Sequence, residues 1–246
     1  MDEAAGRWSA REALTYEGQR WSFAALQTEV DRAAKAFIAL GIQAGERVTL
    51  WMPSRPEWLY TFLALAKIGA VVVPINTRFR TSDLAYVLWQ SDATTLITVD
   101  RSGPVDYLAM VHELCPSLVS SAPGQLHVEP FPQLRHVVIL GARPGLGAHH
   151  WNEIMTGAAA VSSAALEQRH RHVDPDATVL TLYTSGTTGF PKGVMHSHNI
   201  QRTVIDAGSR VGMTPRDVIL MYLPYFTSSG CTKGCSCRSS PGPGWC

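Results

Sequence analysis

Residues 183–193 bring together side chains that could bind phosphate. The segment reads YTSGTTGFPKG, and the sequence predicts that it forms a single turn. Its glycines allow positive φ angles and a close approach of the backbone, so that successive N–H groups can face one anion. A lysine adds a charge-assisted hydrogen bond worth about 1.5–3 kcal/mol. The composition favours a phosphate-binding loop over an ordinary polar connection. The candidate residues are Thr184, Ser185, Gly186, Thr187, Thr188, Gly189 and Lys192.

The order of these residues differs from that of the Walker loop. A Walker loop reads G-x-x-x-x-G-K-[ST], with a hydroxyl residue after the lysine to bind magnesium. Here Gly193 follows Lys192, and Gly189 lies three positions before it. The motif therefore argues against the phosphate loop of kinases and GTPases.

The remaining pattern predicts the elements that position this loop. Apolar residues recur at helical spacing over 23–40, ahead of Gly41, and a second helix is expected between Pro56 and Gly69. Residues 141–176 suggest a surface loop with short helices. Strands alternating with helices predict an α/β fold with a mainly parallel sheet and flanking helices, and the phosphate loop should leave the carboxyl end of a strand. The expected strands are 71–73, 96–99, 137–140, 179–182 and 218–220.

Composition excludes several functional classes. The chain has 246 residues, enough for one large or two ordinary domains, and its 21 basic and 20 acidic residues predict no nucleic-acid or anionic-membrane partner. The longest apolar stretch, 61–75, is interrupted by Lys67 and Gly69 and is too short to span a bilayer. The N-terminal residues do not resemble a signal peptide, so a cytoplasmic location is expected.

Histidine and cysteine provide no convincing metal site. The histidine pairs lack carboxylate or cysteine partners at ligand spacing, so surface or capping roles are expected, including a helix-start role for His198. Cys115 precedes Pro116 at an expected helix end, where a buried structural role is favoured over that of a nucleophile.

The chain resembles the AMP-forming acyl-CoA synthetases of the adenylate-forming superfamily. Their signature is similar to the segment TSGTTGFPKG, and the likeness extends over residues 14–76, 78–98 and 218–234. The resemblance implies that residues 1–234 form the incomplete N-terminal part of an AMP-binding domain. Long- and medium-chain fatty acyl-CoA synthetases are the members it resembles most.

The resemblance also implies a two-step reaction. A carboxylate attacks ATP to give an acyl-adenylate and pyrophosphate, and coenzyme A then displaces AMP. ATP, Mg²⁺, a carboxylic acid and coenzyme A are the implied ligands. Lys192 would be catalytic and would hold the outer phosphates with the other motif residues. Phe226 and Thr227 are candidates for the acyl pocket, with Thr227 at a position where relatives often carry histidine.

Other parts of the family's machinery have no counterpart in these residues. We therefore expect the chain to be inactive by itself. A non-catalytic fragment that binds nucleotide or pyrophosphate is the alternative, and the sequence does not predict the oligomeric state.

Residues 235–246 read CSCRSSPGPGWC and fit no helix or strand pattern. A metal site is disfavoured because Cys235 and Cys237 are too closely spaced for the usual zinc pair, and disulfides would conflict with a cytoplasmic location. A shift of one base allows the apolar run VLLPLLAGARLV, which continues the family resemblance. We therefore interpret these residues as an out-of-frame tail.

Overall fold

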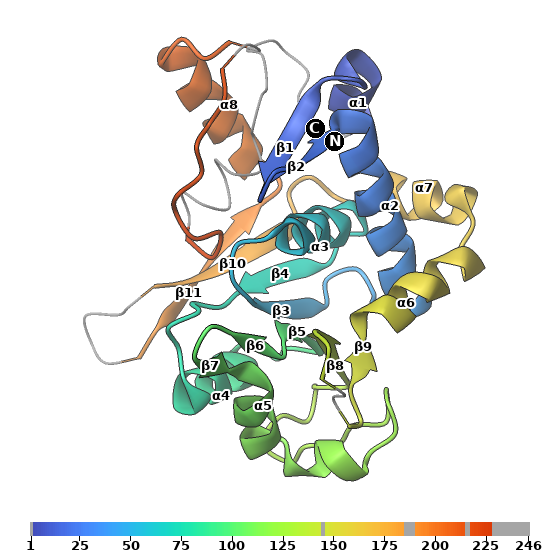
Figure 1. Ribbon diagram of the computed structural model, residues 1–246, viewed down its shortest axis with the longest axis vertical. Helices are drawn as coiled ribbons and strands as arrows, with labels where there is room; N and C mark the ends of the chain where they lie inside the picture. Colours follow the sequence, from blue (N-terminus) through green and yellow to red (C-terminus); the bar gives the residue numbers. More distant parts are fainter. Residues whose placement is uncertain (1, 144–145, 185–189, 215–216, 228–246) are drawn as a thin grey trace.

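The computed structural model describes residues 2–143, 146–184, 190–214 and 217–227, and they form an α/β fold (Figure 1). Helices and strands alternate over most of this range, as the sequence predicts. The helices are α1 (Asp2–Trp8), α2 (Phe23–Ala39), α3 (Pro56–Lys67), α4 (Thr81–Gln90), α5 (Tyr107–Leu114), α6 (Trp151–Gly157), α7 (Ser163–Arg171) and α8 (Ile200–Arg210), with short 3-10 helices at Pro116–Ser120 and Ala158–Ala160. No helix in the described part of the chain combines the length and apolar character needed to cross a bilayer.

The central sheet has the strand order β11-β10-β4-β3-β5-β8-β9. All its neighbouring strands are parallel except β10 and β11, which form an antiparallel pair. This arrangement confirms the mainly parallel sheet. Two antiparallel pairs, β1–β2 and β6–β7, lie outside it. The strands are β1 (Glu12–Tyr16), β2 (Gln19–Ser22), β3 (Arg47–Trp51), β4 (Val71–Pro74), β5 (Thr95–Val99), β6 (Arg101–Ser102), β7 (Val105–Asp106), β8 (His136–Leu140), β9 (His149–His150), β10 (Thr178–Thr184) and β11 (Lys192–Ser197).

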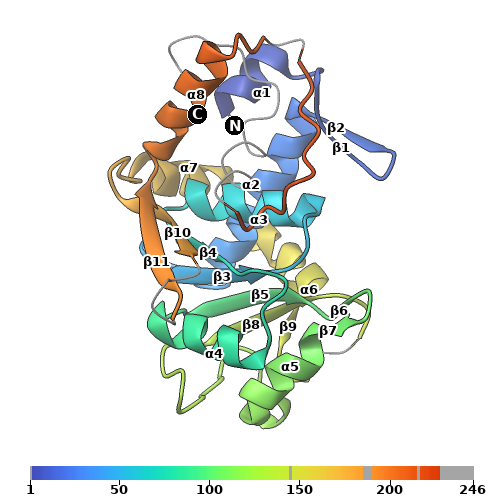
Figure 2. The same cartoon turned by 90° about the vertical axis from the view of Figure 1, so that its left-hand side faces the viewer.

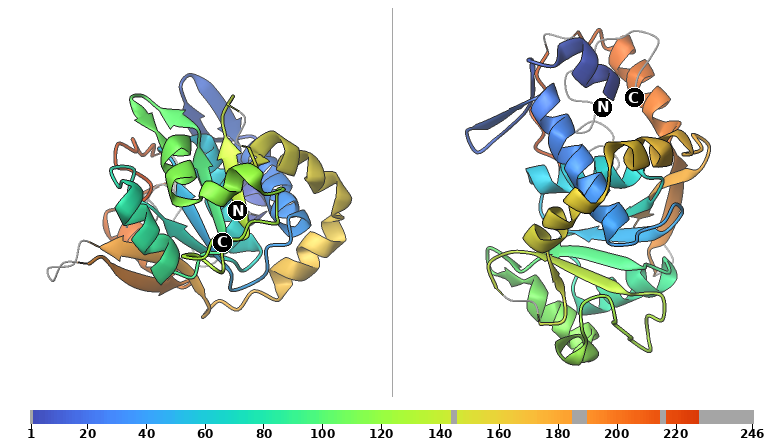
Figure 3. Two further views of the ribbon diagram at one scale, coloured as in Figure 1. Left: turned by 90° about the horizontal axis from the view of Figure 1, so that it is seen from below. Right: turned by 90° about the vertical axis from the view of Figure 1, so that its right-hand side faces the viewer.

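Helices cover both faces of the central strands, which explains their continuous apolar sequences. α2 and α3 lie on one face, and α4 and α5 lie on the other (Figures 2 and 3). Every residue of β4 and β5 is buried between these layers. The core is therefore built around β3, β4 and β5, with α2 and α3 packed against each other above it.

Local signals set the ends of the two helices predicted from the sequence. The Ser22 hydroxyl accepts a hydrogen bond from the amide of Ala25 at 3.1 Å and caps the start of α2. Pro56 occupies the first turn of α3. Gly41 and Gly69 follow the two helices with φ angles of +93° and +78°, as expected for residues that end a helix.

Four of the five predicted strands are present, as β4, β5, β8 and β10. The prediction for residues 218–220 is wrong, because these residues form no strand. Val218 and Leu220 are 68% and 84% exposed. A strand needs hydrogen bonds to a neighbour, and no strand among the described residues pairs with this segment. The short helices α6 and α7 confirm the prediction for residues 141–176 in part, but this range also contains β9 of the central sheet and the buried residues Ile154 and Met155 of α6. Residues 235–246 lie outside the described residues.

Candidate phosphate-binding site

The phosphate motif connects two paired strands. In the β10–β11 ladder, Tyr183 pairs with Gly193 and Thr184 pairs with Lys192. The prediction of a single turn over residues 183–193 is therefore wrong at both ends, because antiparallel pairing extends to these residues. Residues 185–189, which include the candidates Ser185, Gly186, Thr187, Thr188 and Gly189, lie outside the described residues.

The hairpin places Thr184 and Lys192 at the carboxyl edge of the central sheet. β10 runs parallel to β4, with Leu180 paired to Val72, so Thr184 lies at the end of β10 where open α/β sheets bind ligands. Thr184 and Lys192 are both exposed. The Thr184 hydroxyl lies 3.5 Å from the carbonyl oxygen of Lys192. The structure thus brings the first and last candidate residues of the motif to facing positions of one ladder.

Helix α4 contributes residues that the sequence interpretation missed. The Tyr86 hydroxyl donates a hydrogen bond to the Pro191 carbonyl oxygen, and the Tyr183 hydroxyl donates one to the Gln90 side-chain oxygen. Burial, together with nearby Tyr86 and Asp92, raises the pKa of Tyr183 to about 12, so its hydroxyl keeps its proton at neutral pH. The spacing of four residues between Tyr86 and Gln90 was an available signal that both lie on one helix face.

The two acyl-pocket candidates follow a buried aromatic residue. Phe226 and Thr227 are half-buried, and the Thr227 hydroxyl donates to the carbonyl oxygen of Pro224 at 2.8 Å. Tyr225 is buried with its ring centroid 5.1 Å from that of Trp58 in α3. The amide of Tyr225 also donates to the Ser54 hydroxyl at 3.0 Å. These contacts attach the segment to α3, and the acyl-pocket role of Phe226 and Thr227 stays a prediction.

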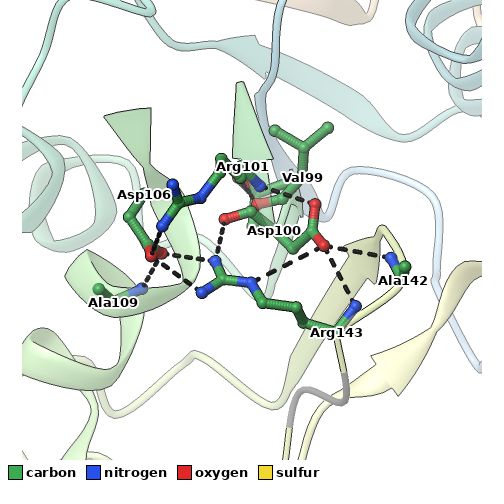
Figure 4. Close-up of polar contacts among 8 residues, drawn as sticks. Val99, Asp100, Arg101, Asp106, Ala109, Ala142 and Arg143 are labelled. Atoms are coloured by element: carbon green, nitrogen blue, oxygen red, sulfur yellow. Dashed lines mark hydrogen bonds and ion pairs between the residues drawn. The ribbon is translucent and has the colours of Figure 1, made fainter. Parts of the chain in front are cut away.

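A polar network ties together the carboxyl ends of β5 and β8 (Figure 4). The Asp100 carboxylate accepts hydrogen bonds from the amides of Arg101, Ala142 and Arg143 at 2.7, 3.1 and 3.2 Å. The Arg143 guanidinium in turn donates two hydrogen bonds to the Asp106 carboxylate, at 2.6 and 2.9 Å. The network therefore fixes the loop after β8 relative to β5 and to the β6–β7 hairpin.

Asp106 also begins helix α5. Its carboxylate accepts a hydrogen bond from the amide of Ala109 at 2.9 Å and caps the helix. The bonds from Arg143, from this amide and from Arg101 hold the pKa of Asp106 well below its usual range. Since Arg101 and Arg143 both bind Asp106, this cluster is a structural network with its cations already paired.

Several histidines have structural roles, and some of these roles were expected from the sequence. His172 lies at the end of α7, and its ring nitrogen Nδ1 lies 2.7 Å from the carbonyl oxygen of Gln168. His136 and His149, on adjacent strands, share a hydrogen bond of 3.2 Å between ring nitrogens, a pairing that the sequence interpretation did not consider. His198 lies two residues before α8, and its carbonyl oxygen accepts a hydrogen bond from the amide of Gln201 at 3.3 Å, in agreement with the expected helix-start role. Burial lowers the pKa of its imidazole.

Neither cysteine nor metal chemistry gains support from the described residues. Cys115 is buried at the end of α5, and burial raises its pKa to about 11, which confirms the expected structural role. The described part of the chain contains no group of three or more histidine, cysteine, aspartate or glutamate residues that could hold a metal ion.

An α/β sheet with a glycine- and threonine-rich hairpin at its carboxyl edge is an arrangement suited to binding phosphate-containing ligands. Residues 1–238 match the family model described as AMP-binding enzyme, so the chain belongs to the AMP-binding enzyme family. The resemblance seen in the sequence is confirmed.

Relatives include acyl-CoA synthetases and ligases. The chain is 35% identical over 237 residues to the Bacillus subtilis protein YngI, named as an acyl-CoA synthetase, covering 95% of this chain and 43% of that protein. It is 32% identical over 217 residues to the mouse mitochondrial medium-chain acyl-CoA ligase ACSF2, covering 87% and 35% of the two chains. The chain thus spans about two fifths of the length of these relatives.

A solved structure shows the same fold. The long-chain-fatty-acid-CoA ligase FadD1 from Archaeoglobus fulgidus superposes with a TM-score of 0.73, over 94% of this chain and 42% of that chain. The sequences are 22% identical, so the comparison supports the fold class alone.

Proposed function

We propose that residues 1–234 are the N-terminal part of the AMP-binding domain of an acid–thiol ligase. The whole enzyme would activate a fatty acid or a related carboxylic acid with ATP and transfer the acyl group to coenzyme A. Family membership and the acyl-CoA ligase names of the relatives support this proposal. A cytoplasmic location is part of it.

The β10–β11 hairpin is the observation that carries the proposal. It places exposed Lys192 opposite Thr184 at the carboxyl edge of the sheet, with the hydroxyl- and glycine-rich residues between them in sequence. When a carboxylate attacks the α-phosphorus of ATP, negative charge collects on the departing pyrophosphate. A preorganised ammonium group and hydroxyl donors stabilise that charge without reorganisation during the reaction.

Mg²⁺ would bind as a complex with the triphosphate of ATP. Magnesium in such sites takes many of its ligands from substrate phosphates and water, and a phosphate motif of hydroxyls and one lysine fits that role. No residue of this chain is assigned to the metal. Phe226 and Thr227 are proposed to face the acyl group, close to the aromatic contact between Tyr225 and Trp58.

Replacement of Lys192 by alanine tests the phosphate site. The loss of one charge-assisted hydrogen bond, worth about 1.5–3 kcal/mol, should weaken binding of ATP–Mg²⁺ and of pyrophosphate roughly 10- to 150-fold. Isothermal titration calorimetry of the purified chain measures this change. Lys35→Ala is the matched control, because Lys35 lies on α2 and its ammonium donates a hydrogen bond to the Ser163 hydroxyl at 2.9 Å. Equal affinities for wild type and Lys192→Ala would contradict the proposal.

The length of the chain favours a second candidate function. Because the chain spans about two fifths of its relatives, it is also a candidate for a fragment that binds nucleotide or pyrophosphate without catalysis. Carboxylate-dependent exchange of labelled pyrophosphate into ATP separates the two functions. Binding without exchange supports the fragment, and exchange by the chain alone would support a complete first half-reaction. Sequencing the coding DNA tests the out-of-frame interpretation of residues 235–246.

A further inference from the structure

Helix α4 holds both ends of the segment that carries the phosphate motif. In the last part of the motif, the Tyr86 ring stacks on Phe190, with centroids 5.2 Å apart and ring planes at 24°. The Tyr86 hydroxyl also donates a hydrogen bond to the Pro191 carbonyl oxygen at 3.1 Å. On the side that precedes the motif, the Tyr183 hydroxyl donates to Gln90. One helix thus contacts β10 and the two residues that lead into β11.

The helix can serve as a rigid support for these contacts. Leu84, Val87 and Leu88 bury the opposite side of α4 in the core. Tyr86 and Gln90 are four residues apart, so they share one face of the helix. Their separation is therefore set by the helix rather than by the hairpin. Phe190 is 70% exposed although it stacks on Tyr86.

We propose that Tyr86 and Gln90 are positioning residues for phosphate binding. By holding Tyr183 and Pro191, they fix the spacing of the two strands directly beside the facing pair Thr184 and Lys192. A ligand that binds between prepositioned groups does not have to order them, and its affinity increases accordingly. This inference rests on the proposed function. It adds that α4, by holding the hairpin, contributes to the binding of both triphosphate and pyrophosphate.

Substitutions of Tyr86 separate its stacking from its hydrogen bond. Tyr86→Ala removes both contacts and should weaken binding of ATP–Mg²⁺ and pyrophosphate roughly tenfold. Tyr86→Phe keeps the stack on Phe190 and should restore part of that affinity. Gln90→Leu removes the contact with Tyr183 and should have an intermediate effect. Ser82→Ala is the control, because Ser82 is an exposed residue on the same helix, whereas the Trp89 ring lies 6.4 Å from that of Tyr86.

Hydrogen exchange without ligand provides a second readout. Tyr86→Ala should accelerate amide exchange in residues 192–194 relative to wild type, while exchange in α2 and β5 stays unchanged. Titration calorimetry with pyrophosphate and ATP–Mg²⁺ then measures affinity. Failure of the wild-type chain to bind either ligand refutes the proposed function, whereas the exchange measurement still decides whether α4 anchors the hairpin.

Three outcomes would overturn the inference. Unchanged exchange in residues 192–194 of Tyr86→Ala would mean that α4 does not hold the hairpin. An equal effect of Ser82→Ala would mean that any disturbance of the helix is sufficient. Faster exchange with undiminished ligand affinity would mean that the anchor does not position the phosphate site.

Discussion

Replacing Gly141 with alanine should displace the Asp100 carboxylate from its place beside the sheet. A β-carbon on Gly141 would lie 2.1 Å from Cγ of Asp100, and 2.3 and 2.4 Å from its two carboxylate oxygens. These separations are far shorter than any van der Waals contact. The Asp100 side chain is only 16% exposed, so it can move away only by giving up the bonds shown in Figure 4.

The expected loss of stability follows from those bonds. The carboxylate accepts three backbone hydrogen bonds, from Arg101, Ala142 and Arg143. A hydrogen bond to a charged group contributes about 1.5–3 kcal/mol, so the loss of two of them should destabilise the fold by about 3–6 kcal/mol. For a chain of this size each kcal/mol lowers the melting temperature by about 2–4 °C, which predicts a decrease of at least about 6 °C.

Gly157→Ala is the matched control for this experiment. Gly157 has helical angles, with φ −59° and ψ −18°, and a β-carbon there would lie 3.7 Å from the Ala39 β-carbon, an ordinary contact. Alanine should therefore be neutral or stabilise the fold by up to about 1 kcal/mol. Thermal and urea unfolding followed by circular dichroism measure both variants. A Gly141→Ala protein that melts at or above the wild-type temperature would refute the reasoning.

Two further predictions concern pH and the exposed segment. Burial, followed by the nearby charges of His149 and Arg135, lowers the pKa of His136 from 6.5 to about 4. Between these two pH values, the unfolded chain therefore binds more protons at this residue than the folded chain does. The stability contributed by this histidine should therefore be complete above pH 6.5 and decline as the pH falls towards 4. His136→Gln should show a smaller difference in urea midpoint between pH 7.5 and pH 5 than wild type. An identical difference would count against this cause. Replacing Val218 and Leu220 together by serine should reduce binding of a hydrophobic dye without lowering the melting temperature, because both side chains are exposed. A large decrease in melting temperature would show that they pack against the fold.

Local sequence signals were sufficient for helices α2 and α3 and for strands β4, β5, β8 and β10, but the list of expected strands did not include β3. Pro56 and Gly69 mark the ends of α3 through their own backbone preferences, and the continuous apolar residues of β4 and β5 indicate burial on both faces. The phosphate motif was visible because its chemistry depends on residue types that are adjacent in sequence. These features need no knowledge of distant parts of the chain.

Strand pairing was not predictable in the same way. Residues 192–197 have a weak strand pattern, yet they form β11 because β10 supplies hydrogen-bond partners. Residues 218–220 have a strong strand pattern, yet they form no strand because no described strand pairs with them. In both cases a neighbour decides the outcome, since a strand is stabilised by bonds between segments rather than within one.

The sequence by itself determined the α/β class, the family resemblance and the residues of the phosphate motif. The tertiary structure alone decided that Thr184 faces Lys192, that Asp100 joins the ends of β5 and β8, and that Tyr86 supports the hairpin from α4. Helix periodicity and motif chemistry depend on neighbours along the chain. Contacts across a sheet or between a helix and a hairpin depend on segments brought together by folding, and the sequence pattern of either segment alone does not contain them.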